Sequence, residues 1–394
     1  MDYTSSSHIS SWIFTSKQLS ELRTRANNEA RRYLQKEQVK KRHQQQLEQQ
    51  QQDDDVRVAN EAGGATSSTS GSSTPLPVSF AKGYAHRTRD HDMPMMTEAS
   101  EPKEELPFLS PPEETTLLNF YATKLFSLIG PKAQHPPLRR DIKVASTAAL
   151  LLRRFYLSNS VMVYDPKVFM VASAFLATKI EDCTVNIKYL EEGTKLMKAH
   201  VPIPEIIKSE IHLAAGIDYD LFCLHPYKTV EAYTEDLRTF LKSKEGSACC
   251  VNRTSVGSAD LLPLYEEAKN IVEQLATTDV PLIATAGKIG LVAMKTAMDT
   301  VTNRDDDENQ QEGIIEIDFR NYLKIRFGGS RTEKEIEDLW SEIEGLCATI
   351  KELSSVETEN MIALKEIHKK FKKCRGGGDE KKKKKKKRKR NDTE

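Results

Sequence analysis

The sequence has few cysteines, no long hydrophobic run and no net charge, and each shortage excludes a class of protein. Its six cysteines form no Cys-x-x-Cys pair and no Cys/His ligand spacing, which argues against a zinc site and favours reduced thiols. No apolar run approaches the roughly 20 residues that a membrane-spanning helix needs, and the opening MDYTSSSHIS lacks the regions of a signal peptide. We therefore expect a soluble, intracellular protein.

The arrangements that carry catalysis are also missing. No nucleophile–base pair, metal-ligand cluster or Gly-rich phosphate loop stands out, and His212 falls within a helical pattern that favours a structural role. We expect no catalytic residues, no metal and no cofactor.

The zero net charge of the 394 residues is the sum of two unlike parts. From residue 379 to 394 the chain has ten Lys or Arg against four Asp or Glu, so this stretch carries +6 and the remainder −6. The negative remainder argues against nucleic acid as a specific partner of the folded region. The basic run favours nuclear import, with phosphate attraction or simple solvation as alternatives. It comprises Lys381, Lys382, Lys383, Lys384, Lys385, Lys386, Lys387, Arg388, Lys389 and Arg390.

Composition divides the chain into five segments. A capping box at Thr15 and Gln18, followed by a narrow apolar stripe, predicts a helix over 15–34 that gives way to a Gln-rich stretch. Small polar residues then indicate a disordered linker. The expected segments are 1–52 (N-terminal helix and Gln-rich extension), 53–105 (disordered linker), 106–224 and 225–353 (two folded units), and 354–394 (C-terminal helix and disordered basic tail).

The pattern of the folded region is helical throughout. Ser110 and Glu113 form a capping box with Pro111 at the first helical position, and four further helices follow at short intervals. A second group of about five helices follows the HPY at His225, and a last helix is predicted over 357–373. No β-hairpin signal appears, so we expect an all-α protein of two successive groups of five helices with flanking helices at both ends.

One predicted helix carries a lysine in an unexpected place. Lys179 of SAFLATKIED shares an apolar stripe with Phe175 and Leu176 on a helix that starts at Asp165-Pro166. Because burying an unpaired ammonium is costly, this lysine needs a partner. An ATP-binding lysine of the kinase type is excluded, since that lysine follows a Gly-rich loop on a β-strand and neither is present.

Two stretches resemble the cyclin family. RRFYLSNSVMVYDPKVFMVASAFLATKIED and SEIHLAAGIDYDLFCLHPY resemble the first box of cyclin H, and the similarity covers roughly residues 108–243. A weaker similarity to the second box extends through 263–353. The resemblance implies an all-α fold of tandem cyclin boxes and a non-catalytic regulatory subunit that grips a cyclin-dependent kinase.

The resemblance also implies a site. In the family a Lys of the third box helix and a Glu of the fifth meet at the kinase-facing edge, and Lys179 and Glu210 match those positions. The alternative is a structural salt bridge without a partner role. Phe169, Leu176 and Tyr189 are candidates for apolar contact with the kinase, although each fits the core equally well. Arg153 and Arg154 could meet an acidic loop, or be ordinary exposed arginines.

The function that the resemblance implies is activation of the CDK-activating kinase. Such a complex phosphorylates activation loops of other cyclin-dependent kinases and the C-terminal repeats of RNA polymerase II, within TFIIH and with a RING-containing assembly subunit, in the nucleus. A transcription cyclin of the C or K type remains an alternative. A TFIIB-like DNA-binding factor is another, but it commonly has a zinc ribbon, which the cysteine spacing excludes.

Overall fold

The computed structural model describes residues 6–61, 107–251, 257, 259–303, 316–355 and 360–375. Helices dominate these ranges, where an isolated antiparallel bridge between Cys250 and Ile317 is the single strand-like pairing. The predicted all-α class is confirmed. The basic run 381–390 and most of the expected linker lie outside the described residues.

The first box is a group of five helices around one core. Its first helix begins as predicted: Ser110 accepts a hydrogen bond from Glu113 N, and the Glu113 carboxylate accepts one from Ser110 N at 2.6 Å. Leu117, Leu151 and Phe155 are fully buried at its centre. The helices are α3 (Pro111–Ile129), α4 (Ile142–Ser158), α5 (Pro166–Ile180), α6 (Ile187–Leu196) and α7 (Ile203–Gly216), with a 3-10 turn η2 (Pro136–Leu138).

The second box repeats this plan around its own core. Helix α11 runs through its middle, where Val292, Ala293 and Met294 are buried against α8, α10 and α13. The main helices are α8 (Tyr227–Phe240), α10 (Leu262–Ala276), α11 (Ala286–Asn303), α12 (Phe319–Phe327) and α13 (Glu333–Ser355). The shorter ones are α9 (Lys244–Ser247), η3 (Ala259–Leu261) and η4 (Val280–Leu282).

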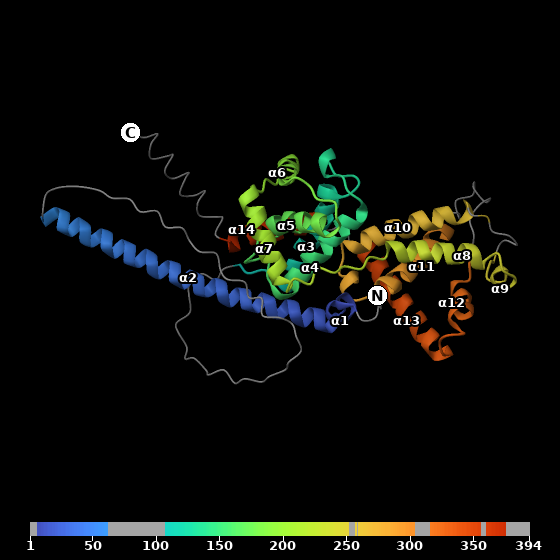
Figure 1. Ribbon diagram of the computed structural model, residues 1–394. Coiled ribbons are helices and arrows are strands. Elements are labelled where there is room, and N and C mark those ends of the chain that lie inside the picture. Colours follow the sequence, from blue (N-terminus) through green and yellow to red (C-terminus); the bar gives the residue numbers. More distant parts are fainter. Residues whose placement is uncertain are drawn as a thin grey trace.

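Helices at both ends of the chain pack on the boxes. Helix α1 (Ser7–Trp12) and the start of α2 (Ser16–Glu61) lie where the two boxes meet, and α2 then runs along the first box and projects beyond it (Figure 1). Helix α14 (Asn360–Cys374) returns to the first box, where Ile367 and Phe371 enter its core. No helix within the described residues combines the length and apolarity required to cross a membrane.

Helix α2 is longer than the sequence pattern predicts. The expected helix ended near residue 34 and the disordered linker began at 53, but α2 continues to Glu61. The expectation was wrong because it relied on an apolar stripe, whereas Gln, Lys, Arg and Glu all have good helix propensity without one. The first glycine after Thr15 is Gly63, so nothing stronger interrupts the helix earlier.

A buried ion cluster joins the boxes and corrects the prediction for Arg153. This arginine is 1% exposed rather than turned outward, and its guanidinium donates to Asp279 Oδ1 at 2.5 Å and to Asn119 Oδ1 at 2.8 Å. Arg23 of α2 donates two 2.6 Å hydrogen bonds to the same carboxylate. Burial would raise the pKa of Asp279, but Arg153 and Arg23 outweigh it and lower that pKa to about 2.

Arg154 is also buried, and it holds the N-terminal helix. Its guanidinium donates to His8 Nδ1 at 3.1 Å and to Asp220 O at 3.1 Å, and it stacks over Trp12 at 4.7 Å. Trp12 in turn donates its indole N–H to the Asp220 carboxylate at 2.8 Å. Both arginines therefore fasten elements of this chain, and neither is available to an external acidic loop.

Candidate functional site

Helix α5 carries the lysine around which the candidate site is built. Asp165 caps the helix by accepting a hydrogen bond from Lys167 N at 2.9 Å, and Pro166 occupies the first helical position. Most of α5 is buried between α4 and α7 as far as Thr178. Lys179 follows directly, so it lies where α5 leaves the core.

The predicted contact between Lys179 and Glu210 is present. Lys179 Nζ lies 2.5 Å from Glu210 Oε1 on α7, and it also lies 4.0 Å from the centre of the Phe175 ring, as a cation–π contact. The Glu210 side chain is 13% exposed and the Lys179 side chain 41% exposed. One flank of the pair is therefore held by the protein, and the other faces solvent.

The expectation that the apolar stripe buries Lys179 is wrong. The stripe of α5 is buried as far as Thr178, but the side chain of Lys179, which follows, remains partly exposed beside Glu210 of α7. The ammonium keeps part of its hydration there, and the helix C-terminus favours a cation at this position. An ion pair exposed to this degree contributes about 0–1 kcal/mol to folding stability, because water screens it.

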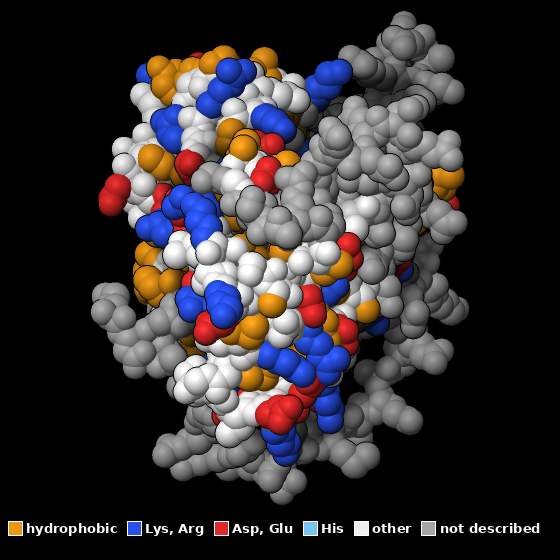
Figure 2. Space-filling model, turned by 90° about the vertical axis from the view of Figure 1, so that its right-hand side faces the viewer, with side chains coloured by type: hydrophobic (Ala, Val, Ile, Leu, Met, Phe, Trp, Pro, Cys, Tyr) orange, Lys and Arg blue, Asp and Glu red, His pale blue; other side chains and the backbone are white. Residues whose placement is uncertain are grey.

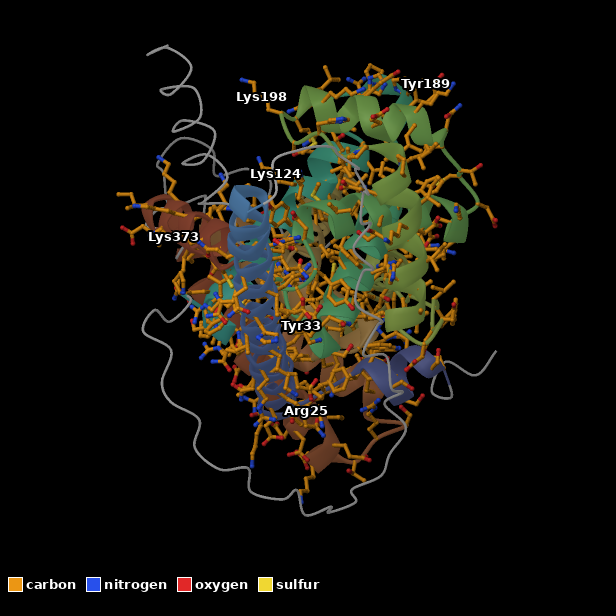
Figure 3. The ribbon with its side chains drawn as sticks, turned by 90° about the vertical axis from the view of Figure 1, so that its left-hand side faces the viewer. Arg25, Tyr33, Lys124, Tyr189, Lys198 and Lys373 are labelled. Atoms are coloured by element: carbon orange, nitrogen blue, oxygen red, sulfur yellow. The ribbon has the colours of Figure 1, made fainter. Side chains whose placement is uncertain are left out.

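The three apolar candidates lie in different environments. Phe169 and Leu176 are 5% and 7% exposed and belong to the first core, where Phe169 stacks on Phe155 at 4.4 Å. Tyr189, labelled on α6 in Figure 3, is 40% exposed. Its ring meets that of His135 edge-on. The structure therefore leaves Tyr189 at the surface and gives Phe169 and Leu176 packing roles.

Phe169 still has one edge at an open groove. This hollow has an empty volume of about 1150 Å³, solvent included, and lies between α5, α7 and the end of α14. Tyr164, Lys208 and His212 line it together with Phe169, and Arg375 closes one side through an ion pair with Asp165 at 3.1 Å. The groove is formed by the same two helices that carry Lys179 and Glu210.

Two isoleucines that sequence reasoning missed lie beside the ion pair. Ile207 and Ile211 on α7 are 45% and 61% exposed, and they flank Glu210 on the helix surface. The helical spacing of the sequence could have indicated them. Ile206 and Leu213 define the buried side of α7, and Ile207 and Ile211 do not lie on that side. We call Lys179, Glu210, Ile207 and Ile211 the α5–α7 surface.

Within the described residues no cluster of metal ligands accompanies this site. Nowhere in the described ranges do three His, Cys, Asp or Glu side chains converge on a position that suits a metal ion. The buried histidines are structural: burial and the nearby Arg154 lower the pKa of His8 to about 4, and its Nδ1 accepts from Leu224 N. What the site offers chemically is an apolar and ionic face suited to binding another protein.

The far end of the second box offers no comparable feature. In the part of the surface that is described there, basic, acidic and apolar side chains are interleaved (Figure 2). Ion pairs such as Arg326–Asp236 and Arg320–Glu337 account for several of these charges. The described part of this end therefore presents no uniformly basic face of the kind that DNA binding by a cyclin-type box requires.

Comparison with known proteins shows what the chain is similar to. No family model matches the chain. Cyclin mcs2 of Schizosaccharomyces pombe is 33% identical over 135 residues, which are 34% of this chain and 39% of mcs2. Cyclin-H1-1 of Arabidopsis thaliana is 24% identical over 234 residues, or 59% and 60% of the two chains. The chain thus spans less than two thirds of the length of these curated relatives.

A solved structure shows the same fold over nearly the whole chain. A chain in the structure of the CAK complex of Chaetomium thermophilum bound to ATP-gamma-S superposes with a TM-score of 0.60, at 20% identity, over 95% of this chain and 88% of that one. The chain therefore shares the helical fold of a chain in that complex, and its sequence is similar to those of cyclins. The relatives that it resembles include a cyclin H.

Proposed function

We propose that this chain is the regulatory cyclin subunit of a cyclin-dependent kinase and that the α5–α7 surface receives the kinase. The partner in this proposal is the CDK-activating kinase, with TFIIH and a RING-containing assembly factor as further partners. Its substrates are the activation loops of other cyclin-dependent kinases and the RNA polymerase II C-terminal repeats. The likeness to cyclin H and to a chain of a CAK complex supports this choice.

One observation carries the proposal: a half-exposed ion pair flanked by two exposed isoleucines on one helical face. Stable protein interfaces combine an apolar centre with a few polar groups that fix the register. Ile207 and Ile211 supply the apolar area, and Lys179 still has donor capacity beyond its bond to Glu210. A partner that covers this face therefore finds both the apolar area and a polar group that can direct its orientation.

The mechanism of activation follows from kinase chemistry. A kinase is active only when its own Lys–Glu ion pair and metal-binding Asp are in place, and this depends on the position of its αC helix. A partner that binds the active position more tightly shifts the equilibrium by the difference in affinity. In this proposal Lys179 and Glu210 hydrogen-bond the backbone near that helix, and the chain itself performs no catalysis.

The remaining assignments belong to the same proposal. The first box spans 106–224, the second spans 225–353, and the basic run after 380 directs the complex to the nucleus. Tyr189 is an additional apolar contact at the α6 end of the first box, since its side chain remains exposed. Phe169 and Leu176 support the docking helices from beneath, because both are buried.

A co-expression pull-down tests the proposal. The full chain is captured with each member of a panel of cyclin-dependent kinases, and each complex is assayed on an activation-loop substrate and on an RNA polymerase repeat peptide. Lys179→Glu reverses the charge beside Glu210, and Ile211→Asp places a charge in the apolar patch. Because disrupting a desolvated pair costs about 2–5 kcal/mol, we expect each variant to weaken capture roughly 30-fold or more.

The matched control is Lys242→Glu, which makes the same charge change at an exposed lysine of the second box. It should bind and activate as the unaltered chain does. The double variant Lys179→Glu with Glu210→Lys keeps an ion pair within the chain but exchanges the positions of its positive and negative charges on the surface. If this double variant regains full kinase binding, the pair acts only within the chain and its proposed contact role is wrong. If the chain captures a different kinase, the α5–α7 surface remains the proposed docking site and only the proposed partner changes.

A further inference from the structure

Helix α14 is fixed to the first box along one side. Phe371 and Cys374 are buried in the core, and His368 meets the Phe120 ring of α3 edge-on at 5.3 Å. Lys370 Nζ binds both carboxylate oxygens of Glu113 at 2.9 and 2.8 Å. These contacts fix the orientation of the helix, so its opposite side is presented to solvent in a defined way.

The opposite side of α14 carries four lysines. Lys365, Lys369, Lys372 and Lys373 are all exposed, and their spacing places them on one face of the helix. Within the described part of the chain, none of the four has a carboxylate within ion-pair distance. We call them the lysine face. Glu366 is the only acidic side chain between the first and last of them.

The lysine face differs from helices on which exposed cations are paired. Several exposed cations elsewhere form an ion pair with a carboxylate of the same helix, as in Arg238–Glu235 and Lys195–Glu191. On α14 the cations instead repel one another at the spacing of one helical turn, which destabilises a helix. The negative sum over the rest of the chain hides this local concentration of positive charge, which the sequence analysis did not predict.

Helix α3 carries a further exposed lysine near α14. Lys124 is exposed and lies over the Phe120 ring at 5.4 Å, and this is the ring that contacts His368 of α14. Figure 3 labels Lys124 and Lys373 on α3 and α14. In the sequence, three glycines after Arg375 lead into the basic run, so the lysine face and that run are separated by only a few residues.

We infer that the lysine face of α14 binds the phosphate backbone of duplex DNA without regard to sequence. Lysine acts on a phosphate as a point charge and supplies affinity rather than base recognition. A protein partner is a poorer fit, because interface centres are depleted in lysine and rich in aromatic anchors, and Ile362 is the exposed large apolar residue that the described surface of α14 offers.

Single-stranded nucleic acid is a poorer fit as well. Proteins that bind it combine basic residues with exposed aromatic rings on which bases stack. The aromatic rings of α14, His368 and Phe371, both face the first box. Duplex DNA needs no such ring, and the nuclear location that we propose for this chain gives access to it.

Fluorescence anisotropy with a labelled 30-base-pair duplex of mixed sequence, titrated from low to high KCl, tests the inference on the full chain. One variant changes Lys365, Lys369, Lys372 and Lys373 to Gln, which keeps helix propensity and removes four charges. A second changes the basic residues of 381–390 to Gln, and a third combines both sets. The matched control changes the exposed lysines 132, 188, 242 and 334 to Gln.

Each phosphate contact contributes about 0.9 to the slope of log affinity against log salt. We expect the lysine-face variant to lower this slope by about 3–4 and the control to leave it unchanged. With the basic run neutralised, binding that still depends on the four lysines supports the inference. Unchanged DNA binding in the lysine-face variant overturns the inference. Binding of a Glu-rich peptide or a duplex RNA more tightly than the DNA duplex overturns it as well. Retained kinase capture by this variant separates the result from the proposed kinase docking.

Discussion

Asp279 holds together three elements that are far apart in the sequence. Its carboxylate accepts hydrogen bonds from Arg153 of α4 and Arg23 of α2, and it lies just before η4 of the second box. Arg153 is 1% exposed, so its charge depends on this carboxylate for compensation. Breaking a buried ion pair is strongly destabilising because the remaining charge stays buried.

We therefore expect Asp279→Asn to lower the free energy of unfolding by about 3–5 kcal/mol, as measured by urea denaturation at pH 7. The amide preserves the shape of the side chain but removes its charge. Asp299→Asn, which alters a more exposed pair with Lys295 on a single helix, should cost well under 1 kcal/mol. Equal losses in the two variants would contradict the role given to Asp279.

At the residue scale the sequence predicted contacts only where a family pattern supplied the partner. Lys179 and Glu210 were paired correctly because the motif names both positions. Arg153 and Arg154 were placed outside because an arginine at the end of an apolar stretch is usually exposed. Their partners are 126 and 146 residues away along the chain, which no local pattern reveals.

Helix α2 combines two stretches with different physical support. Its first half packs on the boxes, with Leu19, Ala26 and Ala30 buried. From Val39 onward the described side chains face solvent, and the helix extends away from the body (Figure 1). The outer half therefore depends on helix propensity and i,i+4 contacts such as Gln44–Glu48 at 3.3 Å.

Proline substitutions should separate the two halves. Gln46→Pro interrupts the exposed part, so we expect circular dichroism at 222 nm to lose helical signal while the thermal midpoint changes by about 1 °C or less. Glu29→Pro interrupts the packed part, where the loss of about 3 kcal/mol or more is transmitted to the whole fold. A several-degree fall in midpoint for Gln46→Pro would show that the outer half packs on the body.

At the element scale the sequence was most informative where helix starts carry capping residues. The capping box at Ser110 and the start at Asp165-Pro166 gave helix starts close to those observed. Helix ends in polar stretches were less predictable, as α2 shows. The expected box boundaries at 224/225 stay a prediction, although the two cores separate on either side of that position.

Two neutral histidines at the junction of the boxes make the whole molecule sensitive to acid. Burial, with Arg154, lowers the pKa of His8 to about 4; burial, with Lys143, lowers that of His225 to about 3. Because each histidine binds a proton less readily in the folded protein than in the unfolded chain, the folded state keeps its full stability above pH 6.5, the ordinary pKa. That stability is lost progressively as the pH falls toward 4. Glu114 acts in the opposite sense, because burial raises its pKa to about 7.

We expect His8 to account for a loss on the order of 3 kcal/mol between pH 6.5 and 4. In His8→Asn the side-chain oxygen can still accept from Arg154 and Leu224 N but does not titrate in this range. Urea unfolding at half-unit pH intervals should give a flatter profile for this variant, with His225 and Glu114 contributing equally to both proteins. Parallel profiles would show that His8 is not neutral in the fold.

The contacts of α1 and α2 also determine the order in which the molecule can form. Ser7 binds Asp220 and Arg23 binds Asp279, partners that are 213 and 256 residues later in the chain. At a synthesis rate of about 5–20 residues per second, the amphipathic N-terminal helix leaves the ribosome roughly 10–50 seconds before its binding sites exist. The N-terminal helices therefore cannot complete their docking until residue 279 has been made, and in the interval their apolar side is open to chaperones.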